Sequence, residues 1–99
     1  MTKTDLIDMV AEKTNMTKKD TGEIINTAVD GIMDYLSEEA DKSEGKRDNV
    51  QIIGFGTFEV KDRSSRKGRN PQTGEEITIP ARKVPVFRAG KTFKETVDK

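Results

Sequence analysis

The sequence of 99 residues contains neither cysteine nor histidine. Without cysteine the chain has no disulfide, no thiolate nucleophile and no Cys-based zinc site. Without histidine no imidazole is available as a general base or metal ligand near neutral pH. These absences argue against an enzyme, and we expect no catalytic residue, no metal site and no cofactor.

Apolar residues are also scarce. Leu, Ile, Val and Phe together number 21, whereas 36% of the residues are charged. A core this lean is marginal in so short a chain, so either the fold is unusually open or a partner chain completes the core. The longest apolar run is far too short to span a membrane, and the N-terminus lacks the apolar core of a signal peptide. We therefore expect a cytoplasmic protein.

The net charge of zero hides an asymmetry between the two halves of the chain. Residues 1–49 carry a net charge of −5, residues 50–99 carry +5, and residues 61–94 alone carry +7. A run of charge is usually only a solvated face. An asymmetry of this size instead suggests that the basic half faces a polyanion.

The acidic half predicts a helical body over residues 1–40. Thr2 and Thr17 each precede an acidic residue three positions later, which is typical of a helix N-cap. Apolar residues follow with helical spacing, and in the second helix they form a wide face. We predict that this face and the aromatic residues of the basic half form the core of a dimer, with Ile25, Val29, Ile32, Leu36, Phe55, Phe58 and Phe87 as its residues.

Residues 38–49 are almost entirely polar. We interpret the start of this stretch as the frayed end of the second helix and residues 41–49 as an extended, exposed loop. Its acidic residues lack the ligand spacing of an EF-hand, so a calcium site is not expected.

The basic half predicts a sheet over residues 50–88 and a short terminal helix over residues 89–99. Residues 50–53 and 57–60 have strand patterns, and glycines at 54 and 56 indicate a tight turn or a close backbone contact between them. Residues 61–74 then contain no Val, Ile, Leu or Phe, and alternation returns at residues 76–79. Such a segment cannot be held by a core. It predicts a long hairpin arm over about residues 61–83, with residues 70–74 at its tip.

The alternation along this hairpin changes phase twice, around Ser64-Ser65 and around Pro80-Ala81. An extra residue in one strand would produce each change, so we predict a β-bulge at both places. Pro80 and Pro85 lack amide donors and suit a bulge or an edge strand.

An exposed basic ribbon is well suited to binding phosphates, and a two-stranded ribbon fits a DNA groove. Pro71 stands at the predicted tip, where an apolar, rigid side chain can enter between base pairs and kink the duplex. An ordinary turn proline is the competing interpretation of Pro71.

Three motifs in this half resemble the signature of the bacterial HU/IHF histone-like DNA-binding proteins. They are GFGTFEV at residues 54–60, RKGRNPQTGE at residues 66–75 and IPARKVP at residues 79–85. The resemblance extends over almost the whole chain, from the opening KTDLI to the Gly90-Lys91 pair before the last helix.

The resemblance implies an α+β fold of the IHF-like DNA-binding type. Its expected parts are two N-terminal helices, a three-stranded antiparallel sheet with a protruding β-ribbon arm, and a short C-terminal helix, assembled as an intertwined homodimer. The arms would enter the DNA minor groove with Pro71 as the intercalating wedge. The expected DNA-binding residues are Lys61, Arg63, Arg66, Lys67, Arg69, Asn70, Pro71, Gln72, Arg82, Lys83, Arg88, Lys91 and Lys94.

The same resemblance implies a nucleoid-associated protein of the HU type, which binds double-stranded DNA with little sequence preference and bends, wraps and compacts it. Nicked, bent or cruciform DNA would also be bound, and a paralogue could replace one chain of the dimer. The alternative is a site-selective, IHF-like bending factor. A protein-binding adaptor that uses the acidic body is a third possibility.

An enzyme is the remaining alternative. Gly90-Lys91-Thr92 resembles the end of a phosphate-binding loop, but proline occupies position 85, where that motif needs glycine. The motif therefore fails.

Two features depart from the family pattern. The loop between Leu36 and Val50 is longer than the family's tight turn. We interpret the extra residues as a solvated insertion; the alternative is that they alter the body surface where dimers meet each other. The chain is also neutral, whereas most HU-like chains are basic. We therefore expect weaker or more salt-sensitive DNA binding than in a basic relative.

Overall fold

The computed structural model describes all residues, 1–99, and divides them into two compact units. The first unit is Met1–Tyr35 and the second is Leu36–Lys99. No helix in the structure is long and apolar enough to cross a membrane.

The first unit is a helical pair, and both predicted N-caps are present. Helix α1 is Lys3–Thr14, and Thr2 and Asp5 form a reciprocal capping box before it. Helix α2 is Lys18–Glu39, and the Thr17 hydroxyl accepts a hydrogen bond from the Asp20 amide at 3.1 Å. Asn15 ends α1 in the left-handed region with φ 56°, which reverses the chain between the helices.

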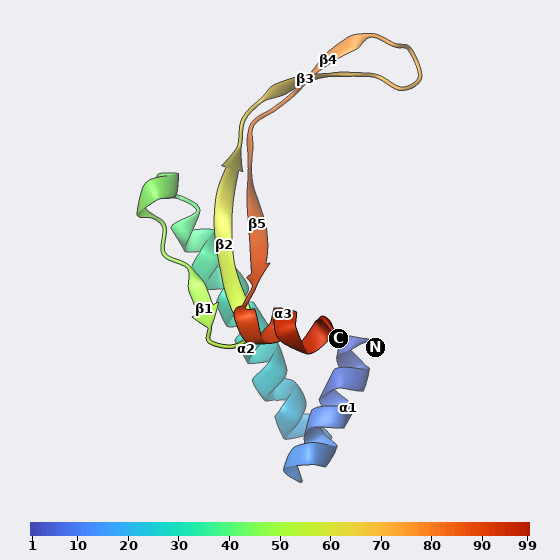
Figure 1. The fold of residues 1–99 in the computed structure, drawn as a ribbon, viewed down its shortest axis with the longest axis vertical. Coiled ribbons are helices and arrows are strands. Elements are labelled where there is room, and N and C mark those ends of the chain that lie inside the picture. Colours follow the sequence, from blue (N-terminus) through green and yellow to red (C-terminus); the bar gives the residue numbers. More distant parts are fainter. The chain divides into compact units, whose positions relative to one another are not determined.

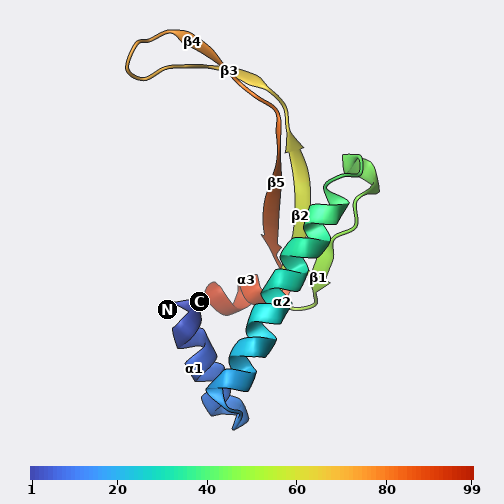
Figure 2. The same ribbon diagram turned by 180° about the vertical axis from the view of Figure 1, so that it is seen from behind.

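The second unit contains the sheet, the arm and the last helix (Figures 1 and 2). Strands β1 (Val50–Ile52), β2 (Gly56–Arg63) and β5 (Arg82–Ala89) form an antiparallel sheet in the order β1-β2-β5. Strands β3 (Arg66–Arg69) and β4 (Glu76–Ile79) form a separate two-stranded ribbon, which continues from β2 and β5 in both views. Helix α3 (Lys91–Val97) ends the chain. The predicted α+β fold with a ribbon arm is confirmed.

The predicted β-bulges are wrong. Arg63 pairs with Arg82 below the break in the ribbon, and Arg66 pairs with Ile79 above it. Two residues are therefore skipped on each strand, and the register stays the same on both sides. Pro80 has no amide hydrogen to donate, so its strand cannot sustain the ladder here. The apparent change of phase is a symmetric interruption rather than an inserted residue.

Four phenylalanines form an aromatic cluster in the second unit. The rings of Phe55 and Phe93 stack with centroids 5.4 Å apart, and Phe58 and Phe87 lie 4.8 Å apart as opposite partners of β2 and β5. A Cβ on Gly56 would lie 2.5 Å from the Phe87 ring and from a backbone oxygen. Glycine is therefore required at this position, as the predicted close backbone contact implied.

Several of the predicted dimer-core residues are not buried within one chain. Leu36 is buried, and Ile25, Ile32 and Phe58 are half-buried, but Val29, Phe55 and Phe87 keep between 39% and 46% of their surface exposed. The buried hydrophobic residues of the chain are Ala11, Leu36 and Val60. The core within one chain is therefore as lean as the composition suggested.

The loop after α2 is exposed, as predicted, except at Arg47. Glu44–Lys46 form a short 3₁₀ turn, η1, and the next side chain, that of Arg47, is only 3% exposed. Its guanidinium donates hydrogen bonds to the carbonyl oxygens of Ala40, Lys42 and Val60. A polar sequence gave no sign of this burial, because arginine is usually exposed.

Candidate nucleic-acid interface

The two-stranded part of the arm carries alternating cations on an exposed surface. Lys67 and Arg69 lie on one face of β3, because they are two positions apart in the strand. Their partners Thr78 and Glu76 lie on the same face, since residues directly opposite share a face. The Lys67 ammonium lies 3.3 Å from a Glu76 carboxylate oxygen. Both charged groups are largely exposed, so solvent and salt weaken this pair and leave the lysine available to a phosphate.

The opposite face of the ribbon carries Arg66 and two isoleucines that lie over a glycine. Ile77 lies directly opposite Gly68, and a Cβ on Gly68 would approach the Ile79 side chain to 3.2 Å. The two isoleucines thus cover the position where β3 has no side chain.

The tip of the arm is a tight turn that presents Pro71. The Asn70 amide donates to the Glu75 carbonyl, and the Asn70 carbonyl accepts from the Gly74 amide, both at 2.8 Å. The Asn70 side chain accepts a further bond from the Gln72 amide at 2.8 Å. Pro71 and Gln72 are exposed, whereas Asn70 is half-buried because its polar groups hold the turn.

The outer face of the sheet at the arm base carries a second group of cations. Lys61, Arg63, Arg82 and Arg88 share this face, because β2 and β5 pair in a single register. Glu59 lies among them and is almost buried. One of its carboxylate oxygens is 3.5 Å from the Lys61 ammonium and 3.3 Å from the Arg88 guanidinium. Glu59 therefore holds the side chains of Lys61 and Arg88.

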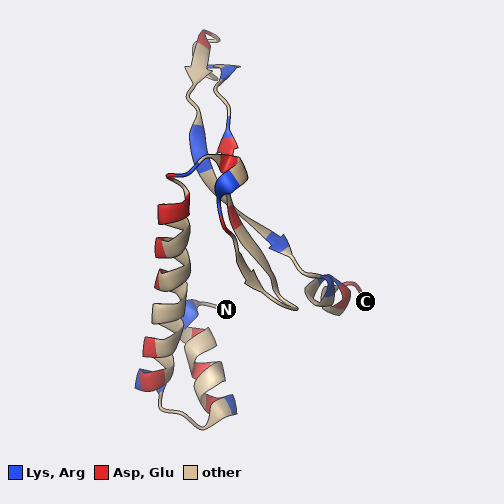
Figure 3. Ribbon diagram, turned by 90° about the vertical axis from the view of Figure 1, so that its left-hand side faces the viewer, with Lys and Arg blue, Asp and Glu red and all other residues tan.

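The remaining predicted cations lie elsewhere in the second unit. Lys83 pairs with Asp62 and therefore faces away from Arg82. Lys91 and Lys94 are exposed on α3, and the Lys91 ammonium lies 3.9 Å from a Glu95 carboxylate oxygen. Figure 3 shows the contrast between the acids spaced along α2 and the cations of the arm strands. The single-chain structure thus brings the arm and arm-base cations together and keeps Lys91 and Lys94 on a separate element.

Two functional features escaped the sequence prediction. Glu59 is the buried carboxylate between two predicted DNA-binding cations. The sequence signal that could have revealed it is an acidic residue between the apolar residues Phe58 and Val60 of a strand. The second feature is the carboxylate of Glu39, which accepts hydrogen bonds from the Lys42 ammonium and the Asp48 amide, both at 2.7 Å. The Lys42 hydrogen bond, followed by that of Asp48, holds the pKa of Glu39 below its ordinary value of 4.5. The same bond raises the pKa of Lys42.

The model of one protein family, described as bacterial DNA-binding protein, matches residues 1–98. The chain belongs to this family. Its relatives include DNA-binding protein HU-1 of Halalkalibacterium halodurans, which is 55% identical over 98% of this chain and 99% of the relative. They also include DNA-binding protein HU of Staphylococcus aureus strain COL, which is 50% identical over the same shares of the two chains.

Two solved structures of the family resemble the fold. The Anabaena HU–DNA cocrystal structure matches with a TM-score of 0.86 and 42% identity, over 98% of this chain and 97% of that chain. HU from Thermotoga maritima matches with a TM-score of 0.65 and 33% identity, over 98% of both chains. The family resemblance expected from the arm motifs is confirmed.

Proposed function

We propose that this protein is an HU-type, non-enzymatic architectural protein that binds double-stranded DNA and bends and compacts it. The observation that carries the proposal is the ribbon arm, whose exposed cations Arg66, Lys67 and Arg69 lie on the strand that leads into a turn presenting Pro71. Phosphate contacts of this kind position a protein without reading sequence. The relatives named HU and the HU–DNA cocrystal structure support the HU type over the IHF type.

The proposed contacts follow the arm from base to tip. Arg63, Arg66 and Arg82 would bind phosphates at the arm base, together with Lys61 and Arg88 after they exchange Glu59 for DNA. Further along, Lys67, Arg69, Asn70 and Gln72 would bind in the minor groove, with Pro71 as the wedge. Lys83, Lys91 and Lys94 would extend the contacts on the body.

The binding unit is proposed to be a homodimer, with each chain as one HU-like domain. The supporting observation is apolar surface that a single chain leaves exposed in both units. In the first unit it includes Ile24 and Met33, at 57% and 56% exposure, and in the second it includes Ile53 at 92%. Burying such surface against a second chain is favourable, and a small domain with little core of its own needs it.

In this proposal residues 1–40 form the body for dimerisation, residues 41–49 the polar loop and residues 50–88 the sheet with its arm. Residues 61–83 are the part that reaches the DNA, and residues 89–99 are the terminal helix. A protein with this function would be located in the bacterial nucleoid.

Binding to a panel of unrelated duplexes across a salt series tests the function. We expect similar affinities for all sequences and a steep fall in affinity with rising salt, because bound phosphates release counterions. Strong preference for one duplex would favour the IHF type, and no binding at low salt would reject DNA binding altogether. Light scattering tests the assembly, and a monomer at micromolar concentration would reject the dimer.

A further inference from the structure

Three arginines line one pocket at the place where the arm leaves the sheet. The pocket has a volume of about 330 Å³ and is lined by Arg63, Ser64, Arg66, Ile79, Pro80 and Arg82. It lies at the interruption of the ladder, where the two strands skip residues 64–65 and 80–81. The absence of cross-strand hydrogen bonds at this point leaves room for the pocket.

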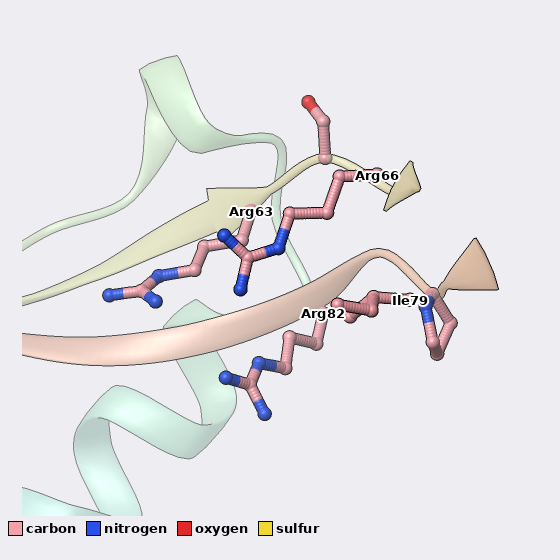
Figure 4. A pocket seen from close by; sticks show the side chains of 6 residues that line it. Arg63, Arg66, Ile79 and Arg82 are labelled. Atoms are coloured by element: carbon pink, nitrogen blue, oxygen red, sulfur yellow. The ribbon is translucent and has the colours of Figure 1, made fainter. Parts of the chain in front are cut away.

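The three guanidinium groups point in the same direction (Figure 4). Arg66 extends back from the start of β3 toward the Arg63 side chain, and the head group of Arg82 lies beside β5 in this view. None of the three forms an ion pair in the structure. The pocket therefore collects three positive charges and no negative one.

This arrangement is unfavourable for the free protein. Arg63 and Arg82 are direct partners across β2 and β5, and like charges directly opposite each other destabilise a strand pair. Elsewhere on the same face, Glu59 supplies a carboxylate to Lys61 and Arg88. The contrast shows that the chain neutralises one pair of cations and leaves the other three for an external anion.

We propose that this pocket binds a phosphomonoester, the terminal phosphate of a nucleotide, in preference to an internal phosphodiester. The inference rests on the proposed DNA binding and refines one part of that surface. A monoester carries up to two negative charges and presents three terminal oxygens, whereas a diester carries one charge and two such oxygens. Arginine forks match phosphate oxygens with two hydrogen bonds each, so three arginines suit the more highly charged group.

The size and walls of the pocket fit a terminal nucleotide. A volume of about 330 Å³ is larger than a phosphate group alone and lies in the range of small-ligand sites. Ile79 and Pro80 provide an apolar wall against which a sugar can pack. The two sources of such a group are the 5′-phosphate at a nick or end of DNA and a free nucleotide.

Binding to a nicked duplex whose nick carries either a 5′-phosphate or a 5′-hydroxyl tests the proposal. We expect about fivefold tighter binding to the phosphorylated nick, which corresponds to one added charge contact at a partly exposed site. The preference should fall as the pH drops below about 6, because the second proton of a phosphomonoester binds there. Equal affinity for the two nicks would overturn the proposal, and no binding to either duplex would instead reject the proposed function.

A pair of variants with the same change of charge locates the effect. Arg82→Gln should remove the preference for the phosphorylated nick, whereas Lys46→Gln, at an exposed residue of the 3₁₀ turn outside the proposed DNA-binding set, should retain it. A preference that survives Arg82→Gln would overturn the assignment to this pocket. Titration with AMP, followed by the arginine Nε–H resonances, distinguishes the sources. Saturable shifts of Arg66 and Arg82 support a site that also takes free nucleotides, and a nick preference without them supports DNA-borne phosphate.

Discussion

The guanidinium of Arg47 donates a hydrogen bond to the carboxylate of Asp62 at 2.9 Å, joining the loop after α2 to the strand that leads into the arm. The same side chain donates to three backbone carbonyls, two just after α2, at Ala40 and Lys42, and one in β2, at Val60. A partly buried carbonyl without a donor costs free energy, so Arg47 satisfies groups that would otherwise be unpaired. The loop after α2 thus braces the base of the arm.

Arg47→Ala should destabilise the fold by about 2–3 kcal/mol, because partly buried carbonyls at Ala40 and Val60 lose their donor. Asp62→Asn is the matched control. The Asp62 side chain is half exposed, so loss of its charge should cost less than about 1 kcal/mol. Urea unfolding at a fixed protein concentration measures both. Equal effects of the two variants would show that the ion pair, rather than the carbonyl contacts, carries the brace.

Acid should weaken the contacts of the same loop through Glu39. Its pKa is lowered in the folded protein, so its contribution to stability is present above the ordinary value of 4.5 and is lost as the pH falls through the lowered folded value. Glu39→Gln should therefore be less stable than the parent at neutral pH, and the difference should shrink in acid. The neighbouring Glu38→Gln is the control, since Glu38 is exposed and makes neither of the contacts of Glu39. A difference that stays constant with pH would contradict this role.

Gly56→Ala should cost about 1–3 kcal/mol or more, because the added methyl group would overlap the Phe87 ring and the Arg88 carbonyl. Gly45→Ala, in the 3₁₀ turn, has nothing within 4 Å of the added carbon and should change stability by less than about 0.5 kcal/mol. Thermal unfolding at one protein concentration compares the two. A tolerated Gly56→Ala would mean that β2 and β5 can separate without loss, contrary to their close approach here.

Much of the fold could be predicted because local signals agree with it. Thr2 and Thr17 mark helix starts by cap chemistry that needs only neighbouring residues, and both caps are present. The absence of Val, Ile, Leu and Phe from residues 61–74 likewise predicts an arm that no core covers. These features depend on contacts within a few residues, so the sequence order reveals them.

Features that depend on contacts between distant residues were missed or misjudged. The phase change at Ser64 looks like a bulge in one strand. Only the pairs on either side of it, Arg63 with Arg82 and Arg66 with Ile79, show that both strands are interrupted together. The burial of Arg47 depends on Val60 and Asp62, which lie 13 and 15 positions away. The three-arginine pocket also needs the register of β2 and β5, because composition alone cannot place Arg82 opposite Arg63.

Pro71→Ala should reduce DNA bending more than it reduces DNA affinity. The cations of the arm remain, so encounter with DNA and most phosphate contacts persist. What is lost is the rigid apolar side chain at the tip, which the hydrogen bonds of Asn70 hold in place. Unstacking a base step costs a few kcal/mol, and an inserted proline ring offsets part of this cost by packing against the bases. The methyl group of alanine is too small to offset as much, so the kink becomes less favourable.

Energy transfer between dyes at the two ends of a duplex measures the bend, and anisotropy under the same conditions measures affinity. Thr73→Ala is the matched control, because it also changes the turn, by removing one hydrogen bond to the Glu75 amide, but leaves Pro71 in place. We expect a smaller bend for Pro71→Ala and a bend close to that of the parent for Thr73→Ala. If the bend is unchanged in Pro71→Ala, Pro71 is an ordinary turn residue, and the arm bends DNA through its charge alone.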